Sequence, residues 1–420
     1  PEITIVSSVF NQTKATANGN AIYIAQTTVN TSIILQLCTF ENCQNSDNNV
    51  IYSQASQLLL NQTEIRFTTT ETTCCGLDIS APCELTIFNS QFTNCSSSKD
   101  GSALNYKPAS TGTERIVLNR TTFTNNCQQS TQSAVYLNVQ TIPTITDCTF
   151  SNHLQSSHTL SIESTTTFDT NITIHSCTFD NNRYESGAAG ISLKLAENTE
   201  VVYEDCNFAN NIATLNGGAL CITSDSKISY KLIGCIFNNN NAREGGSIYL
   251  ENSNEITIEG CEFIQDSTTS ASTDSANSIF AATNSVNVII TDTNFIDCGT
   301  TTGGSSVIIF NGNGLEMSNA EIDFESDVKA RGLKIICDNL VELNDVIFRN
   351  CKATEENGKG GAIHYAEATP STDSTSHISI VGCTFDGNQA SASGYSIYLK
   401  YSTFAMKIER SNFINHVTSS

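Results

Sequence analysis

A short motif that recurs along the whole chain, Cys-x-Phe followed two residues later by Asn, constrains the fold most strongly. Seven cysteines begin its Cys-x-Phe part, at Cys38, Cys148, Cys177, Cys206, Cys235, Cys261 and Cys383, and the Asn stands two residues after the Phe in the first five of these. Variants without the cysteine centre on Phe92, Phe123, Phe295, Phe348 and Phe413, and Phe10, Phe67 and Phe324 fit the phase less well. Together they mark about fifteen units, mostly about 26 to 32 residues apart. Such self-similarity indicates stacked repeats of one small structural unit.

Each unit contains three short segments with the alternation of β-strands. One unit reads GGSIYL from Gly245, then ITIEG up to Gly260, then the Cys261 motif. Alternation places Ile256 and Ile258 on one face, and a one-residue corner at Gly260 resets the phase so that Phe263 also points inward. We therefore predict an all-β fold, a right-handed parallel β-helix of about 15 coils of roughly 29 residues with three strands per coil. Residues 1–420 would form a single domain. A seven-bladed propeller is the alternative, but it needs four strands and about 40 residues per blade.

The asparagines of the motif are expected to turn corners. Asn tolerates the left-handed backbone region and bonds its own backbone. Stacking in register would let the amides form a hydrogen-bonded ladder. The paired glycines, as in GGSIYL, would form the opposite corner, where a side chain would collide with the next coil. The asparagines concerned are Asn42, Asn94, Asn125, Asn152, Asn181, Asn210, Asn239, Asn350 and Asn415.

The net charge of the chain limits the classes of partner that it can bind. The formal net charge is −22, from 20 Lys and Arg against 42 Asp and Glu. Such a field repels nucleic acid and anionic membranes, so we expect no nucleic-acid partner. No apolar run of about 18 residues is present, so no membrane span is predicted. No Cys-x-x-Cys pair occurs, so the sequence predicts no zinc site. We also expect no cofactor.

The repeat resembles a known family. GGAIHY from Gly360 and FDGN from Phe385 are similar to the GGAI and FxxN repeats of the polymorphic outer-membrane proteins and of similar protist surface proteins. The resemblance covers nearly the whole chain as a pattern, but the Asn usually falls two residues after Phe rather than three. No C-terminal membrane barrel follows, which weakens an autotransporter assignment. The resemblance implies a β-helical protein that is extracellular or on the cell surface, often an adhesin, with glycans or cell-surface proteins as partners.

The 17 cysteines are expected to fall into two groups. Those that precede Phe would be small buried residues, because parallel stacked side chains aim poorly at each other for a disulfide. Those near corners are disulfide candidates, and Cys95 with Cys127 is the simplest pair because they lie on neighbouring coils. The candidates are Cys43, Cys74, Cys75, Cys83, Cys95 and Cys127.

Glycosylation sequons are confined to the first part of the chain, and none follows Asn171. Chance alone would produce as many, so only their distribution is informative. Either corner asparagines simply precede structured residues, or the later half is free of glycans because it packs against something. The sequons are at Asn11, Asn30, Asn61, Asn94, Asn119 and Asn171.

One segment is a candidate catalytic face. Glu321, Asp323, Glu325 and Asp327 alternate, with Lys329 and Arg331 close in sequence. Carboxylates on the outer face of a β-helix could bind calcium and act in acid–base chemistry on polysaccharides. A solvated acidic face explains the pattern more simply, and no Trp is available as a sugar platform. We therefore predict a non-enzymatic structural or adhesive protein. The alternative is a polysaccharide lyase or glycosidase that uses the face around Asp323.

Both ends of the sequence are already in the phase of a coil. The start, PEITIVSSVFNQT, and the end, SNFINHVTSS, each contain the strand and Phe motif without a polar cap. An uncovered coil leaves an unpaired strand edge. The chain would then be cut from a longer solenoid or would self-associate end to end into a head-to-tail filament.

Overall fold

The computed structural model contains β-strands and connecting segments throughout its described part, and the contacts divide the chain into two compact units, Pro1–Val202 and Tyr203–Ser420. The structure describes residues 1–15, 19–25, 30–43, 48–67, 75–97, 100–126, 133–156, 158–168, 170–184, 190–223, 228–251, 255–269, 274–282, 287–336, 340–366, 377–400 and 405–416.

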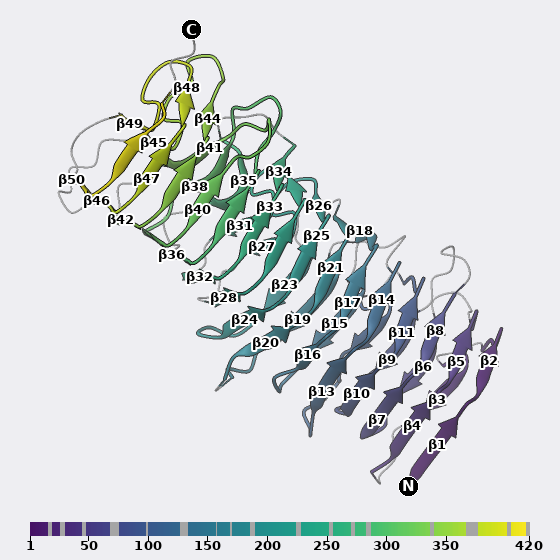
Figure 1. Cartoon of the computed structure of the whole chain (residues 1–420). Coiled ribbons are helices and arrows are strands. Elements are labelled where there is room, and N and C mark those ends of the chain that lie inside the picture. The colour runs from purple at the N-terminus through teal and green to yellow at the C-terminus, as the bar shows by residue number, and fades with distance from the viewer. Residues whose placement is uncertain are drawn as a thin grey trace. The chain divides into compact units, whose positions relative to one another are not determined.

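Pro1–Val202 is a parallel β-helix in which every coil gives one strand to each of three sheets (Figure 1). The first sheet holds the Ile-Thr-Ile segments: β1 Glu2–Val6, β4 Ser32–Gln36, β7 Gln57–Asn61, β10 Glu84–Phe88, β13 Arg115–Asn119, β16 Thr144–Thr146 and β20 Ile172–His175. The second holds the Phe motifs: β2 Val9–Asn11, β5 Thr39–Glu41, β8 Glu64–Arg66, β11 Gln91–Thr93, β14 Thr122–Thr124, β17 Thr149–Ser151 and β21 Thr178–Asp180. The third holds β3 Ile22–Ile24, β6 Asn49–Ser53, β9 Cys75–Ile79, β12 Leu104–Tyr106, β15 Val135–Asn138, β19 Leu160–Glu163 and β23 Ile191–Lys194. Two short strands, β18 Leu154–Ser156 and β22 Arg183–Tyr184, pair beside them.

Tyr203–Ser420 repeats the same architecture, and β24 (Glu200–Glu204) contains the boundary. Its first sheet holds β28 Ser229–Ile233, β32 Glu255–Glu259, β36 Asn287–Thr291, β39 Gly314–Ser318, β42 Leu340–Asn344, β46 His377–Val381 and β50 Ala405–Glu409. The second holds β25 Asn207–Ala209, β29 Ile236–Asn238, β33 Glu262–Ile264, β37 Asn294–Ile296, β40 Glu321–Asp323, β43 Ile347–Arg349, β47 Thr384–Asp386 and β51 Asn412–Ile414. The third holds β27 Leu220–Thr223, β31 Ile248–Glu251, β35 Ala276–Ala281, β38 Ser306–Phe310, β41 Arg331–Ile335, β45 Ile363–Ala366 and β49 Ile397–Lys400. Short strands pair at one corner: β26 Ile212–Ala213, β30 Asn241–Ala242, β34 Ser267–Thr268, β44 Lys352–Ala353 and β48 Gln389–Ala390.

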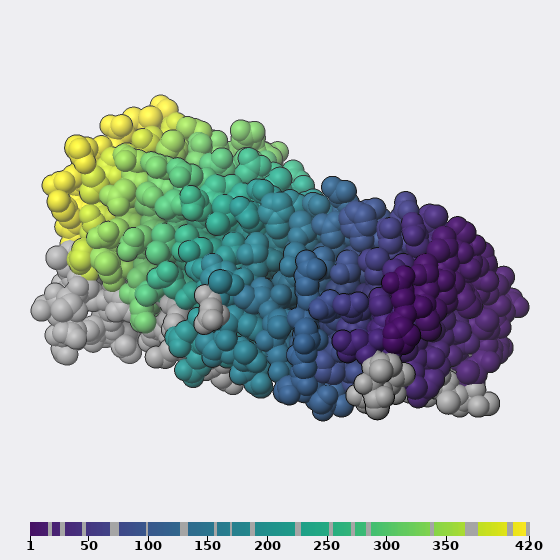
Figure 2. Space-filling model, turned by 90° about the horizontal axis from the view of Figure 1, so that it is seen from below, coloured from purple at the N-terminus to yellow at the C-terminus, as the bar shows by residue number. Residues whose placement is uncertain are grey.

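The predicted fold, an all-β parallel β-helix with three main strands per coil, is confirmed, and the number of coils is close to the expected fifteen. All pairings between the described strands of a sheet are parallel, because each strand meets the same segment of the neighbouring coil. Successive coils lie side by side within each unit, as the order of colours in Figure 2 shows.

The interior contains in-register stacks of apolar side chains, with runs of Phe rings on the second sheet. Phe208, Phe237 and Phe263 stack with ring centroids 4.9 and 4.6 Å apart and nearly parallel planes. Ile256 and Ile258 are buried beside them, as the alternation predicted. Phe67 and Phe324 do not join the stack, because Ile65 and Ile322 are the residues in register with the neighbouring Phe rings. Those two coils therefore fill the Phe position with a branched aliphatic residue.

The left-handed conformation predicted for the corner asparagines and the tight corner predicted for the paired glycines are confirmed. All nine motif asparagines have positive φ, between 51° and 57°, which is the left-handed region expected of them. Gly260, at the corner before Cys261, has φ +61°. A Cβ on Gly246 would lie 2.0 Å from the carbonyl oxygen of Asn277 on the next coil, so only glycine fits there.

Candidate functional site

The acidic segment is split between a strand and the bend that follows it. Glu321 and Asp323 flank the buried Ile322 on β40 and point outward, as the alternation predicted. The strand ends at Asp323, so Glu325 and Asp327 do not continue the alternation but lie exposed in the following bend. The expected row of four outward carboxylates is therefore wrong for its second half, because a corner interrupts the strand.

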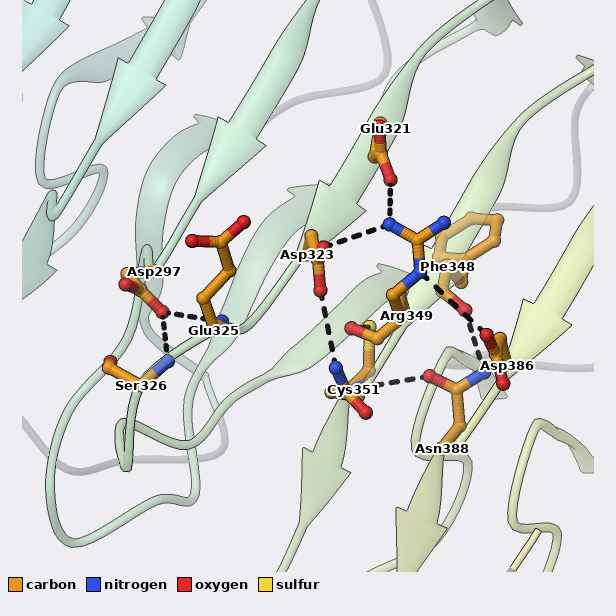
Figure 3. A network of polar contacts seen from close by, with 11 residues as sticks. Asp297, Glu321, Asp323, Glu325, Ser326, Phe348, Arg349, Cys351, Asp386 and Asn388 are labelled. Atoms are coloured by element: carbon orange, nitrogen blue, oxygen red, sulfur yellow. Dashed lines mark hydrogen bonds and ion pairs between the residues drawn. The ribbon is translucent and has the colours of Figure 1, made fainter. Parts of the chain in front are cut away.

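Arg349 organises the carboxylates that remain on the sheet. Its Nη1 lies 3.0 Å from Oδ2 of Asp323 and also contacts Glu321. Its Nε lies 3.7 Å from Oδ2 of Asp386, and Figure 3 shows the guanidinium between these three carboxylates. The register produces this arrangement, because Asp323 pairs with Arg349 on β43 and Arg349 with Asp386 on β47.

Asp323 is the most buried carboxylate of this group. Only 8% of the residue is exposed, and its Oδ1 accepts a hydrogen bond of 3.3 Å from Nδ2 of Asn350. The hydrogen bond from Arg349 to Asp323 raises the pKa of the guanidinium above its usual value, with Glu321 and Asp386 adding to the effect. One permanent cation thus balances part of the charge of three carboxylates, and both oxygens of Asp323 already have donors.

Asp297 binds the backbone of the bend after β40 and is not part of the Arg349 group. Its Oδ1 accepts hydrogen bonds of 2.9 Å from the backbone amides of Glu325 and Ser326 (Figure 3). The two cations that follow the acidic segment also lie elsewhere: Lys329 bridges to Thr300 through its backbone, and Arg331 on β41 pairs with Glu355. The proximity of Lys329 and Arg331 in sequence therefore does not become a shared site with Asp323.

Sequence reasoning missed Arg349 and Asp386. The signal was available, because each follows the motif Phe by one residue, at the same position of the repeat as Asp323 is relative to Ile322. In the described part of the chain, no group of three or more His, Cys, Asp or Glu is arranged to hold a metal ion. Nor does any helix in that part have the length and hydropathy needed to cross a membrane.

A second polar ladder, also missed, runs inside the corner three residues after the motif Phe. Asn240 and Asp266 are fully buried there on successive coils. The amide of Asn240 donates to Oδ1 of Asp266 at 2.9 Å, and Nδ2 of Asn240 donates to the carbonyl of Phe208 at 2.9 Å. Other coils place Asn126, His153, Asn182, Asn211 and Asn388 at the same position, all fully or almost fully buried. The third residue after Phe is therefore a buried polar position, and the second is the left-handed corner, which is half-buried in some coils and exposed in others.

The candidate cysteines are buried where they are described. Cys43, Cys75, Cys83 and Cys95 lie in the interior, and Cys74 and Cys127 fall outside the described residues. Burial raises the pKa of the Cys83 thiol to about 12, so it stays protonated at physiological pH. The pairing of Cys95 with Cys127 stays a prediction.

The sequon asparagines differ in exposure. Asn11, Asn30 and Asn171 are exposed, which a glycan acceptor requires. Asn61, Asn94 and Asn119 are half-buried, and Nδ2 of Asn94 donates to the carbonyl of Phe67 at 2.7 Å. A glycan on Asn94 would break that bond, so the exposed three are the better acceptors.

Comparison with known proteins supports the fold. A family model described as a right-handed beta helix region matches residues 110–285. No curated protein and no solved structure matches the chain significantly. The right-handed β-helix is thus shown, and this architecture serves both enzymes and surface proteins.

Proposed function

We propose that the protein is a non-enzymatic, extracellular or surface-exposed β-helix with a structural or adhesive role. The observation that carries this proposal is the use of its outward polar side chains for contacts between coils. Arg349 joins Glu321, Asp323 and Asp386, and Nδ2 of Asn239 donates to Oδ1 of Asn210 at 2.9 Å. Such ladders stabilise the contacts between coils and leave the candidate acids bound to a protein cation.

The requirements of acid–base catalysis also favour a non-enzymatic role. A catalytic pair needs one carboxyl that gives a proton and one carboxylate that receives it or attacks. Glu321 and Asp323 instead contact the same nitrogen of Arg349. One guanidinium therefore holds both carboxylates, so the two are not separated into a proton donor and a proton acceptor.

The deciding experiment compares polysaccharide turnover by the wild type and by Asp323→Asn, with and without calcium. We expect no turnover above background from either protein. Eliminative or hydrolytic cleavage of uronate or neutral polysaccharides that disappears in Asp323→Asn would overturn the proposal and establish the carbohydrate-active alternative. Asp297→Asn, which alters a carboxylate of the neighbouring bend, is the matched control.

End-to-end self-association is part of this proposal. The first coil exposes Ile3, Val9 and Tyr23, and the last described coil exposes Phe413 and Ile414, each by 44% or more. Apolar side chains on unpaired strands favour addition of further strands. Sedimentation and electron microscopy should show concentration-dependent rods that a Pro at Ile5 or Ile408 abolishes, since Pro removes a ladder donor. A monomer at all concentrations would contradict this part.

A further inference from the structure

One position of the buried polar ladder in Pro1–Val202 is filled by a titratable side chain. Three residues after the motif Phe, successive coils place Asn126, His153 and Asn182, all fully or almost fully buried. Oδ1 of Asn126 accepts from the backbone amide of Cys95 at 2.9 Å, and its Nδ2 donates to the carbonyl of Phe92 at 3.2 Å. Asn182 makes the corresponding two bonds to its preceding coil at 3.1 Å each. An asparagine offers this acceptor and this donor at every pH.

His153 joins the preceding coil through one ring nitrogen only. Its Nδ1 lies 3.1 Å from the backbone nitrogen and 3.0 Å from the carbonyl oxygen of Asn126. Its Nε2 is buried and has no hydrogen-bond partner among the described residues. The neutral imidazole, which has one donor and one acceptor, therefore fills the ladder position less completely than an asparagine would.

Protonation of this ring would remove the acceptor that the ladder uses. An imidazolium donates from both nitrogens, so Nδ1 could no longer accept from the backbone amide of Asn126. Nε2 would then carry an N–H that meets no acceptor in the described interior. A buried charge without hydrogen-bond partners is costly. The contact between the coils of Asn126 and His153 thus requires a neutral ring.

The described groups that face His153 from the neighbouring coils are uncharged. The preceding coil presents the backbone of Phe123 and Asn126, and the following coil presents the side chain of Asn182. Tyr184 of the following coil is also buried, and burial raises the pKa of its phenol, which therefore stays neutral. None of these groups supplies a negative charge that would stabilise an imidazolium.

The charged residues of the following coils lie at the surface. Asp180 is half-buried on the outer face of β21, Arg183 is exposed, and the side chain of Lys194 is 74% exposed. A second histidine, His158, lies on the same coil as His153, and its carbonyl accepts a bond of 3.3 Å from the amide of Ala134 on the preceding coil. Burial, followed by the charge of Lys194, lowers the pKa of His158 to about 4. Both histidines therefore respond to acid in the same direction.

The sign of the pH dependence follows from the burial of His153. Burial, opposed by backbone hydrogen bonds of Asn126 and Phe123, lowers the pKa of His153 to about 4, whereas an unfolded histidine has a pKa of about 6.5. Between these two values the open state binds a proton that the closed state does not. The stability of the contact is therefore complete above about pH 6.5 and is lost as the pH falls toward 4, with opening up to about tenfold more favourable per pH unit.

We propose that His153 makes the contact between β14 and β17 an acid-sensitive element, which is closed at neutral pH and opens reversibly in acid when the ring is protonated. This regulatory inference goes beyond the proposed function and does not depend on it. Tyr203–Ser420 has a carboxyl, Asp266, at the same ladder position. Burial raises the pKa of Asp266, so that position should become more stable over the same fall in pH.

The test is hydrogen exchange of the full chain at pH 7.5 and pH 4.5, read by mass spectrometry and corrected for intrinsic rates. In the wild type, protection of residues 122–126 and 149–153 should fall at least about tenfold in acid relative to His153→Asn, which restores the asparagine of the neighbouring coils. Protection should return when the sample is brought back to pH 7.5. An equal change in the wild type and in His153→Asn would overturn the inference.

Two comparisons locate the effect. His175→Asn is the matched control, because His175 is a half-buried histidine of β20 in the same unit and lies outside the ladder; it should keep the acid response of the wild type. Loss of the response in His175→Asn would overturn the assignment to His153. The wild type alone also carries the test if a variant does not fold, since residues 122–126 should lose protection in acid while residues 262–266 gain it. A change of the same sign in both segments would contradict the inference.

Discussion

Asp323 and Arg349 lie directly opposite each other on adjacent coils, with Oδ2 of Asp323 3.0 Å from Nη1 of Arg349. The arginine side chain is 37% exposed and the aspartate side chain 11%. The pair therefore lies at the border between interior and solvent. An ion pair in such a place stabilises the fold only moderately, but removal of one partner lowers the stability because the other is left unpaired.

Removal of the Arg349 guanidinium tests how much the fold depends on this pair. We expect Arg349→Met to lower the free energy of unfolding by about 1–3 kcal/mol, because the mostly buried carboxyl group of Asp323 would lose its hydrogen-bond donor on Arg349. Urea unfolding of Arg349→Met, Asp323→Asn and the double variant measures the coupling. Losses that simply add in the double variant would contradict an interaction between the two residues.

The exposed asparagine corner can be tested at Asn210. This residue has φ 56°, and its Oδ1 accepts a hydrogen bond from Asn239. Asn210→Leu should cost about 1–3 kcal/mol through strain and the lost acceptor. Asn210→Gly keeps the favourable backbone and should cost less. Equal unfolding midpoints for the wild type and Asn210→Leu would disprove the role of this corner.

The aromatic stack makes a larger contribution at each buried position. Phe208 is fully buried and stacks 4.9 Å from Phe237. Phe208→Ala should cost about 3–5 kcal/mol, because the cavity cannot collapse between fixed coils. Phe413→Ala, at a ring that is 44% exposed, is the matched control and should cost clearly less. The comparison is made by chemical denaturation, and similar costs would argue against a buried stack.

Asp266 should make stability depend on pH. It is fully buried, its Oδ2 has no hydrogen-bond partner among the described residues, and burial raises its pKa to about 7. Because the folded pKa exceeds the unfolded value, the folded state binds more protons between about pH 4 and pH 7, and stability falls as pH rises through that window.

The matched substitution is Asp266→Asn, since Asn240 occupies the same ladder position one coil earlier. We expect this variant to be more stable than the wild type above pH 7, by a few kcal/mol at most, and to lose the dependence between pH 4 and pH 7. Urea unfolding at pH 5 and pH 8 measures both. The difference in unfolding free energy between the wild type and the variant should change between the two pH values. An unchanged difference would contradict the prediction.

The inward cysteines should resist modification. Cys235, Cys261 and Cys383 are at most 1% exposed, and burial raises the pKa of Cys383. Iodoacetamide should label these three only after unfolding, whereas the partly exposed Cys221 should react first. Peptide mapping by mass spectrometry gives the rates. Native labelling of Cys235 as fast as that of Cys221 would show that the interior is not closed.

The period of the sequence determined the fold, because a parallel β-helix repeats one local pattern in every coil. Ile256, Ile258 and Phe263 alternate inward for reasons of strand geometry alone, and Gly246 is required by close approach of the next coil. The left-handed corner at Asn210 likewise follows from the conformational preference of its own residue type.

Only the tertiary structure decided which outward side chains meet. Asp323, Arg349 and Asp386 are far apart in sequence and come together because register aligns them across coils, and the length of each intervening loop sets that register. Lys334, His364 and Tyr398 meet for the same reason. The sequence shows which side chains leave the core, whereas their neighbours depend on contacts between coils that the local pattern does not contain.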